Sequence, residues 1–303
     1  MSAGIELCAG TELCVGAELC VGAGVAQRAL RLTDAADPRL AGYGLVAQPS
    51  ALLRAGWFVA EGRLVVERLL SERRHQIESL LLSESAYRVL DTALAASGLD
   101  APVYVCPTGL FERLTGYDFH RGCLALVRRP APLDWRALAG GARVLVVLEA
   151  VANVDNVGGV FRNAAAFGAD GVLLDPGSAD PLYRKAVRTS MGATLRVPFA
   201  TLGGDSSARA ERRWPECLSE LAASGFELIA LTPGASAQDI DAFAGLPDRP
   251  ERFALLLGAE GSGLSARALE LCRYRLRIAM RPEVDSLNLA VACGIALQRL
   301  MPR

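Results

Sequence analysis

The hydrophobic pattern is most regular in the second half of the chain, where short apolar runs alternate with amphipathic stretches. The runs after residue 142 are RVLVVLEA, GVLLD, LRVPF, FELIALT, RFALLLG and YRLRIAM. Between them, stretches such as GGVFRNAAAFGA, PLYRKAVRTSMGA and WPECLSELAAS have helical patterns. Near-continuous apolar strands separated by helices are typical of a parallel sheet covered on both faces. We therefore predict an α/β fold with a parallel sheet for residues 143–303.

The first half predicts a smaller α/β domain over residues 25–130. GWFVAEGRLVVERLL predicts a strand followed by a helix, and IESLLLSES, APVYVCP and GCLALVRR predict further strands. The Pro, Gly and Arg content of RRPAPLDWRALAGGAR indicates a connection, so we place a linker at residues 131–142. The final segment, SLNLAVACGIALQRL, is apolar on nearly all sides and predicts a helix buried in the domain or in an oligomer interface.

Residues 1–24 contain a repeat of six residues that places Cys8, Cys14 and Cys20 in register. This period fits neither a helix nor a strand, and three copies cannot bury a continuous core. A metal-binding or redox tail is one interpretation. We favour a disordered extension, which translation of repetitive DNA upstream of the true start would explain.

Composition and charge narrow the class of protein. No run of about 18 uncharged apolar residues occurs and the N-terminus lacks a secretory pattern, so we expect a cytoplasmic protein without a membrane span. The eight cysteines form no CxxC pair, which argues against disulfides and zinc. The formal charge of −1 means that any attraction for nucleic acid must come from local arginine patches.

Polar residues concentrate at three junctions that follow predicted strands. The first, NVDNVGGVFRN, contains Asn156, Gly158, Gly159 and Arg162. The two glycines would allow a backbone or a ligand to approach closely. By itself the junction is also explained by an Asn156 side chain that caps the helix and an Arg162 on the surface.

The second junction, LLLGAEGSGLS, places Glu260 among three glycines. The spacing is GxxGxG, and no acidic residue ends a strand about 20 residues later, so a dinucleotide site is disfavoured. A tight loop that offers backbone groups to an uncharged part of a ligand fits better, although a plain glycine-rich turn is the simpler alternative. The third junction, IAMRPEVDSLNLAVA, has Asp285 or Ser286 as helix cap. Asn288 should destabilise this apolar helix unless its amide finds a partner.

Together, and in this order, the three junctions resemble the SpoU/TrmH-type RNA ribose 2′-O-methyltransferases of the SPOUT superfamily. The matching residues are, for N-x-G-x-x-x-R, Asn156, Gly158 and Arg162; for G-x-E-G-x-G, Gly258, Glu260, Gly261 and Gly263; and for S-L-N, Ser286, Leu287 and Asn288. FVAEGRLVVERLL and GYDFHRGCLALV resemble the ribosomal-protein-like substrate-binding domain that precedes this catalytic domain in many members.

The resemblance implies a deep trefoil knot in residues 143–303, S-adenosylmethionine as cofactor, and a homodimer; from the cysteines and histidines we expect no metal. Periodicity alone could not suggest a knot, because knots are almost absent from proteins. The cofactor-binding residues that it implies are Thr232, Pro233, Gly258, Ile278, Met280 and Leu287. The chain has Ile278-Ala279-Met280 where many members have Ile-Pro-Met, so the shape of this loop is in question.

The resemblance also assigns catalytic roles. Arg162 would activate the ribose hydroxyl; because a guanidinium is very hard to deprotonate, we expect it to bind the neighbouring phosphate and stabilise the developing alkoxide. Asn156 and Glu260 would orient Arg162 or the ribose, with Asn156 acting across the dimer interface as one option. Ser286 and Asn288 would fix the loop and the substrate.

Candidate RNA contacts come from basic clusters. Arg184, Lys185 and Arg188 share one predicted helix, with Arg184 and Arg188 on the same face. Arg128–Arg129 and Arg73–His75 are further clusters, for which a solvated surface is an equal alternative. His75 and His120 are the only histidines, which argues against a histidine triad or a zinc centre.

Three functions stay open on the sequence. The first is an RNA 2′-O-methyltransferase, with rRNA favoured over tRNA as substrate. The second is a non-catalytic RNA-binding protein with the knotted fold, against which the intact Arg162, Glu260 and Asn288 argue. The third is a nucleotide-dependent enzyme of the dinucleotide class, which the absence of an early GxGxxG disfavours.

Overall fold

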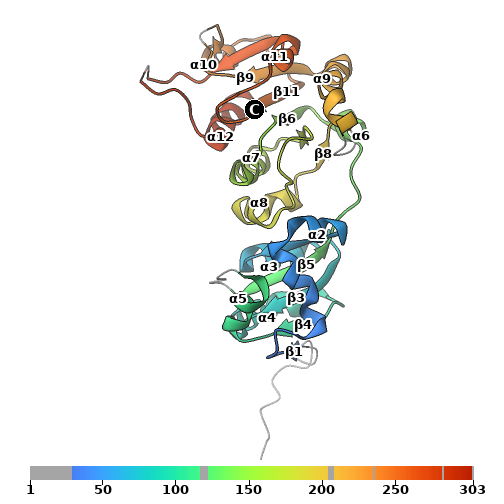
Figure 1. The fold of residues 1–303 in the computed structure, drawn as a ribbon. Coiled ribbons are helices and arrows are strands. Elements are labelled where there is room, and N and C mark those ends of the chain that lie inside the picture. Colours follow the sequence, from blue (N-terminus) through green and yellow to red (C-terminus); the bar gives the residue numbers. More distant parts are fainter. Residues whose placement is uncertain (1–28, 117–121, 204–207, 235, 282, 302–303) are drawn as a thin grey trace, which may run out of the picture.

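The computed structural model describes residues 29–116, 122–203, 208–234, 236–281 and 283–301. These residues form two α/β lobes, one above the other in Figure 1, joined by a connection at residues 129–134. The extension predicted over residues 1–24 lies outside the described residues, as does His120.

The first lobe is built on a five-stranded sheet with the order β1-β4-β3-β5-β2. Its strands are β1 (Ala29–Arg31), β2 (Trp57–Glu61), β3 (Ile77–Leu82), β4 (Val103–Val105) and β5 (Cys123–Arg128). Strands β1, β4 and β3 are parallel, whereas β5 runs antiparallel to both β3 and β2. Its helices are α1 (Ala41–Gly44), α2 (Pro49–Arg54), α3 (Arg63–Glu72), α4 (Glu84–Ser97) and α5 (Thr108–Thr115), with 3-10 turns at Pro38–Leu40 and Leu45–Ala47.

The second lobe contains the predicted parallel sheet. Its seven strands have the order β10-β12-β9-β11-β6-β7-β8, and all six neighbouring pairs are parallel. The strands are β6 (Val144–Glu149), β7 (Gly171–Leu174), β8 (Phe199–Thr201), β9 (Glu227–Leu231), β10 (Gln238–Asp239), β11 (Phe253–Gly258) and β12 (Tyr274–Arg277). The helices are α6 (Trp135–Gly141), α7 (Val154–Phe167), α8 (Arg184–Thr189), α9 (Ala208–Ala223), α10 (Ile240–Ala244), α11 (Ala266–Leu271) and α12 (Leu289–Leu300), with a 3-10 turn at Ala193–Leu195.

Alternate residues of this sheet pack into two apolar cores, one on each face. Val146 and Leu148 face the core formed with α7, α10 and α12. Leu145 and Val147 face the opposite core, formed with α6, α9 and α11. Because both faces are covered, both sets of positions are apolar, and this explains why the strands are continuous apolar runs in the sequence.

Two elements differ from their predicted extent. The run LRVPF was expected to be a strand, but β8 begins only at Phe199, after Pro198, which has no N–H to donate to a sheet ladder. Residues 135–141, inside the predicted linker, form α6, and Trp135 packs into the second lobe. Helix α12 buries one face, including Cys293 and Leu297, but leaves Val291 52% exposed. Within the described ranges, no helix combines the length and apolarity needed to cross a bilayer.

Candidate active site

Helix α7 carries the first motif. Its N-cap is Asn153, whose side chain accepts a hydrogen bond from the Asp155 N–H at 2.9 Å, so the capping role considered for Asn156 is wrong. Asn156 lies in the first turn and is only 3% exposed. Its Oδ1 accepts a hydrogen bond from Asn288 Nδ2 at 2.9 Å. The amide of Asn156 is therefore used for a long-range contact and not for the helix end.

The glycine pair of α7 allows two neighbouring helices to approach. A Cβ atom at Gly158 would lie 2.9 Å from the carbonyl oxygen of Ala186 in α8. A Cβ atom at Gly159 would lie 2.5 Å from the Cβ of Ala290 in α12. Both distances are far below normal contact, so these glycines fix the packing of α7 against α8 and α12. The sequence predicted that a backbone or a ligand approaches these glycines. A backbone does so at Gly158, whereas at Gly159 the close neighbour is the Ala290 side chain.

The second motif forms a tight loop after β11. A Cβ atom at Gly258 would lie 2.2 Å from the carbonyl carbon of Gly263, because the loop folds back onto the end of the strand. An isolated bridge between Ala259 and Gly263 closes this turn. Gly261 has φ +92° and Gly263 has φ +68°, conformations that favour glycine. The loop is therefore shaped by its glycines, as expected, and its tip is exposed.

A buried carboxylate that the sequence reasoning missed anchors the end of this loop. Glu149, at the end of β6, is 6% exposed. It accepts hydrogen bonds from Trp214 Nε1 at 2.7 Å and from the backbone N–H and Oγ of Ser265 at 2.9 and 2.7 Å. Ser265 in turn caps α11. The available signal was the acidic residue that ends the apolar run VLVVLE.

Asn288 connects the three motifs. It is the N-cap of α12, because its Oδ1 accepts from the N–H groups of Ala290 and Val291; the predicted cap at Asp285 or Ser286 is therefore wrong. Its Nδ2 donates to Asn156 Oδ1 at 2.9 Å and to Glu260 Oε1 at 3.2 Å. One amide thus caps a helix and holds residues of α7 and the β11 loop together.

Arg162 does not join this network. It is exposed, and among the described residues its side chain has no hydrogen-bonding or ion-pair partner. It follows Asp155 by seven positions on α7, so the two side chains share a helix face. Ser286 is also exposed and outside the network. The structure therefore joins Asn156, Glu260 and Asn288, and leaves the Arg162 guanidinium open to solvent.

The predicted cofactor residues lie at and beyond one edge of the second sheet. Strands β12, β9 and β11 are neighbours and parallel, so their C-terminal ends meet at this edge. Thr232 and Pro233 follow β9, Gly258 ends β11, and Ile278 follows β12. Met280 and Leu287 belong to the segment that leads from β12 to Asn288, and both are partly buried. This combination of half-buried apolar side chains and open loop backbone suits an adenosine-like group.

A cavity of about 1030 Å³ lies elsewhere, between the two lobes. It is lined by the connection at residues 129–136, by His75, and by residues 174–182 and 194–201. None of the motif residues lines it. We place the site at the edge of the sheet because three separated motifs converge there through direct hydrogen bonds, whereas the cavity has no such convergence.

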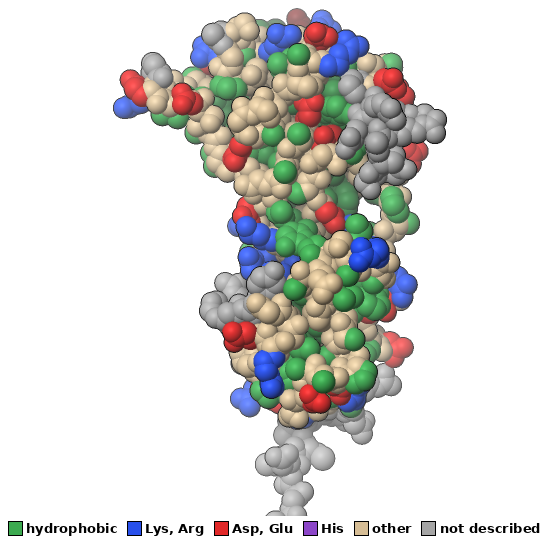
Figure 2. All heavy atoms as spheres, in the orientation of Figure 1, with side chains coloured by type: hydrophobic (Ala, Val, Ile, Leu, Met, Phe, Trp, Pro, Cys, Tyr) green, Lys and Arg blue, Asp and Glu red, His purple; other side chains and the backbone are tan. Residues whose placement is uncertain are grey.

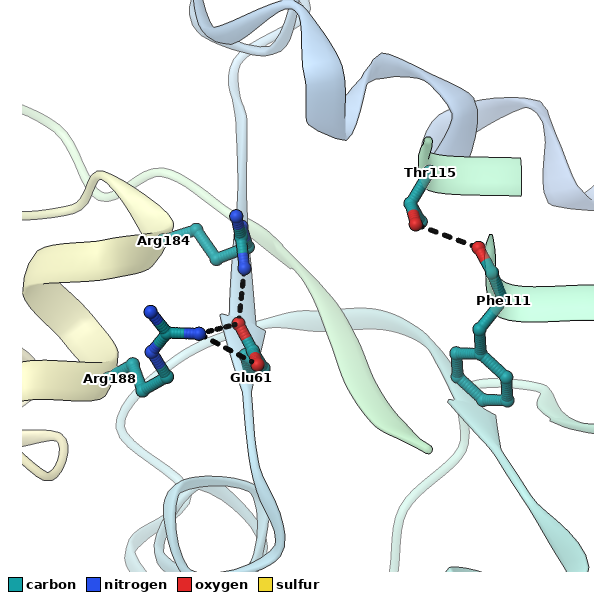
Figure 3. A network of polar contacts seen from close by, with 5 residues as sticks. All are labelled: Glu61, Phe111, Thr115, Arg184 and Arg188. Atoms are coloured by element: carbon teal, nitrogen blue, oxygen red, sulfur yellow. Dashed lines mark hydrogen bonds and ion pairs between the residues drawn. The ribbon is translucent and has the colours of Figure 1, made fainter. Parts of the chain in front are cut away.

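The basic residues of α8 have protein partners. Figure 3 shows Arg184 and Arg188 pointing at the carboxylate of Glu61, which ends β2 in the first lobe. Lys185 pairs with Asp155 at 2.6 Å, and this contact holds the pKa of Asp155 below its usual value. The Arg184 side chain is only 13% exposed and so is not a surface contact for RNA, while Lys185 and Arg188 are about half exposed. Figure 2 shows Lys and Arg side chains gathered on the left side of the junction between the two lobes, level with α8.

The cluster at Arg73–His75 is also engaged with protein atoms. Arg73 donates to the carbonyl oxygen of Ala96, and Arg74 lies 3.9 Å from Glu72. His75 Nε2 is 2.8 Å from the carbonyl oxygen of Leu195 in the second lobe. The contact of His75 therefore joins the two lobes, whereas those of Arg73 and Arg74 lie within the first lobe.

No group of residues suited to a metal ion occurs in the described part of the chain. Of the cysteines within it, Cys106, Cys123, Cys272 and Cys293 are free and buried, and Cys217 is buried. Burial raises the pKa of Cys272 and Cys293 to about 12, so these thiols are protonated and unreactive at neutral pH.

Comparison with known proteins identifies the family. The SpoU rRNA methylase family matches residues 143–298, about half of the chain. A protein of Mycobacterium bovis named as an uncharacterized tRNA/rRNA methyltransferase is 38% identical over 87% of this chain and 88% of its own length. The 23S rRNA (guanosine(2553)-2′-O)-methyltransferase RlmP of Bacillus subtilis is 29% identical over 78% of this chain and 90% of its own.

A solved structure shows the same fold. The AdoMet-bound rRNA methyltransferase from Sinorhizobium meliloti superposes with a TM-score of 0.69 at 23% identity, over 90% of this chain and 97% of that one. SpoU methyltransferases use S-adenosylmethionine, which confirms the predicted cofactor for the family. With the parallel sheet and the converging motifs, these likenesses confirm the resemblance seen in the sequence: the chain belongs to the SpoU rRNA methylase family and is an RNA methyltransferase.

Proposed function

We propose that the chain transfers the methyl group of S-adenosylmethionine to a ribose 2′-hydroxyl of RNA. The observation that carries this proposal is the pair of hydrogen bonds from Asn288 to Asn156 and Glu260. These bonds assemble the three motifs at one edge of the sheet, beside the loop of Gly258. The similarity to RlmP, which is named as a 2′-O-methyltransferase, supports the ribose hydroxyl as the acceptor.

In this proposal the cofactor lies at the C-terminal ends of β9, β11 and β12. Gly258 and the exposed loop after it offer backbone groups, and Ile278, Met280 and Leu287 offer apolar contact. S-adenosylmethionine supplies an electrophilic methyl group on its sulfonium. The protein must therefore hold the acceptor hydroxyl in line, and positioning of this kind contributes up to ~7–11 kcal/mol to a reaction barrier.

Arg162 provides the charge that the acceptor needs. Its guanidinium is exposed and has no protein partner among the described residues, so it can bind an RNA phosphate. A positive charge held beside the ribose also stabilises the alkoxide that develops as the 2′-hydroxyl loses its proton. Asn156, Glu260 and Asn288 hold the β11 loop and α7 together. Ser286 is exposed two residues before Asn288, where it would contact the substrate.

The first lobe, within residues 25–130, would bind the RNA, and rRNA is the favoured substrate because RlmP is named for 23S rRNA. We further infer a homodimer through the surface of α7 and α12. Phe167 and Val291 expose apolar side chains there, at 36% and 52%. Sedimentation equilibrium of the full chain tests this; a monomer at micromolar concentration would contradict it.

We also infer that the chain is knotted in the second lobe. The segment between β12 and α12 returns to contact α7 and the β11 loop through Asn288, as a threaded chain would. Pulling the chain from its two ends provides the test. A knotted chain stops short of its full contour length, and an unknotted chain extends completely.

The central experiment measures Arg162→Ala with radiolabelled S-adenosylmethionine and total rRNA and tRNA from methylation-deficient cells. We expect methyl transfer to fall by roughly 100-fold or more, while S-adenosylmethionine binds normally. The control is Arg267→Ala, which removes an exposed arginine that pairs with Glu270 on α11. Retained transfer by Arg162→Ala, or a product methylated on a base and not on the ribose, would reject the proposal.

A further inference from the structure

Helix α8 lies between the first lobe and α7. On one side, Leu182 and Val187 pack in a single apolar core with Phe58 and Val65 of the first lobe. On the other side, the backbone of α8 meets Gly158 so closely that no larger residue fits there. Helix α8 therefore links the first lobe to the helix of the first motif, and the neighbouring 3-10 turn at Ala193–Leu195 packs on both as well (Figure 1).

Glu61 holds α8 to the first lobe by charge. Glu61 is 8% exposed, and its carboxylate binds Arg184 and Arg188, with the Arg188 Nη1 at 3.2 and 3.3 Å from the two oxygens (Figure 3). The two arginines are four positions apart and would repel each other without it. A buried ion pair that loses one partner leaves an uncompensated charge, so this contact resists separation of the lobes.

The contacts continue from α8 into the methyl-transfer site. Lys185 pairs with Asp155 at 2.6 Å, and Thr189 Oγ1 donates to the same carboxylate at 2.9 Å. Asp155 precedes Asn156, which binds Asn288. A short series of contacts thus connects Glu61, at the end of β2 in the first lobe, to Asn288, which joins the three motifs.

We propose that Glu61 is a positioning residue: by clamping Arg184 and Arg188, it fixes the first lobe on α8 and so sets where RNA bound by that lobe meets the methyl donor. This inference rests on the proposed function. It requires the two lobes to act as one rigid unit during transfer. A loosened clamp would leave RNA and cofactor binding intact and misplace the ribose.

The test compares Glu61→Gln with Glu78→Gln in the full chain. Glu78 pairs with Arg128 at 2.8 Å within the first lobe, so its loss removes a carboxylate of the same sheet without touching α8. We expect Glu61→Gln to lower kcat on RNA by roughly 10- to 100-fold, with KM for RNA and the affinity for S-adenosylmethionine unchanged. Small-angle X-ray scattering should show a larger radius of gyration. Glu78→Gln should match the wild type in every measurement.

A double variant separates positioning from damage to the fold. Glu61→Gln combined with Arg184→Gln removes both charges of the buried pair, and we expect it to recover part of the turnover lost by Glu61→Gln alone. Normal kcat and an unchanged radius of gyration in Glu61→Gln would overturn the inference. So would a fall in kcat matched by an equal fall in cofactor affinity. If the wild type forms no ribose methyl group, the proposed function fails, and the scattering result alone still decides whether Glu61 clamps the lobes.

Discussion

The Nδ2 atom of Asn288 lies 2.9 Å from Oδ1 of Asn156, although the two residues are 132 positions apart in the chain. The same amide caps α12 through its oxygen. One side chain therefore has two separable functions, an acceptor for the helix end and a donor for the motif network.

Asn288→Asp separates these two functions. Aspartate caps a helix as well as asparagine does, so we expect α12 to keep its N-cap and the helix content seen by circular dichroism to be unchanged. The new carboxylate cannot donate to Asn156 and repels Glu260, so methyl transfer should fall by about tenfold or more. Asn153→Asp is the matched control, because Asn153 caps α7 and takes no part in the network. Equal turnover in the two variants would show that the Asn288 donor has no role.

Gly258→Ala should abolish cofactor binding. The added Cβ would sit 2.2 Å from the carbonyl carbon of Gly263, so the loop after β11 must move away from the strand end. Calorimetric titration with S-adenosylmethionine measures the loss. Gly140→Ala is the control, since a Cβ there meets nothing within 4 Å. It should bind the cofactor normally and stabilise α6 by about 0.5–1 kcal/mol. Normal binding by Gly258→Ala would remove this loop from the cofactor site.

Glu149→Gln should destabilise the second lobe. Glutamine keeps one oxygen, but its NH₂ group must face donors from Trp214 or Ser265. Hydrogen bonds to a charged group contribute about 1.5–3 kcal/mol, so we expect a loss of this order in the free energy of unfolding. Urea denaturation followed by Trp fluorescence measures it. A variant as stable as the wild type would show that the neutral side chain satisfies the same partners.

Asp155→Asn should reveal a contribution to stability that depends on pH. The hydrogen bond with Lys185 lowers the pKa of Asp155 in the folded protein from its ordinary value of 3.8. A lowered folded pKa stabilises the protein above the unfolded pKa, and this stabilisation is lost as the pH falls through the folded value. The stability difference between wild type and variant should therefore be constant at pH 5–7 and shrink below about pH 4. A difference that does not change down to pH 3 would assign the effect to packing.

The hydrophobic pattern predicted most of the strands because their burial is local and uniform. Val144–Glu149 and Phe253–Gly258 are buried along their whole length, and each is therefore a continuous apolar run. The failures involve residues whose roles depend on distant partners. Which asparagine caps a helix depends on where the helix begins, so Asn153 and Asn288 were not distinguished from their neighbours.

The sequence did not identify the partners of the charged residues. Arg184 follows a surface-like pattern, but its guanidinium meets Glu61, 123 positions earlier in the chain. Glu149 binds Trp214, 65 positions later. The spacing within each motif indicated the chemistry of the site. Which basic side chains can bind substrate depends instead on the contacts between the lobes, because these contacts pair some of the charges with protein groups.

The central place of β6 in the second sheet has a consequence for synthesis of the protein. β6 pairs on one side with β7, which follows soon after it, and on the other with β11, which ends at Gly258. During synthesis, the edge of β6 that pairs with β11 therefore stays unpaired until the ribosome has added the roughly one hundred residues between these two strands. An unpaired apolar edge is a site of aggregation. We therefore expect the yield of folded protein to depend on the rate of translation and on the supply of chaperones, and not only on the stability of the folded state.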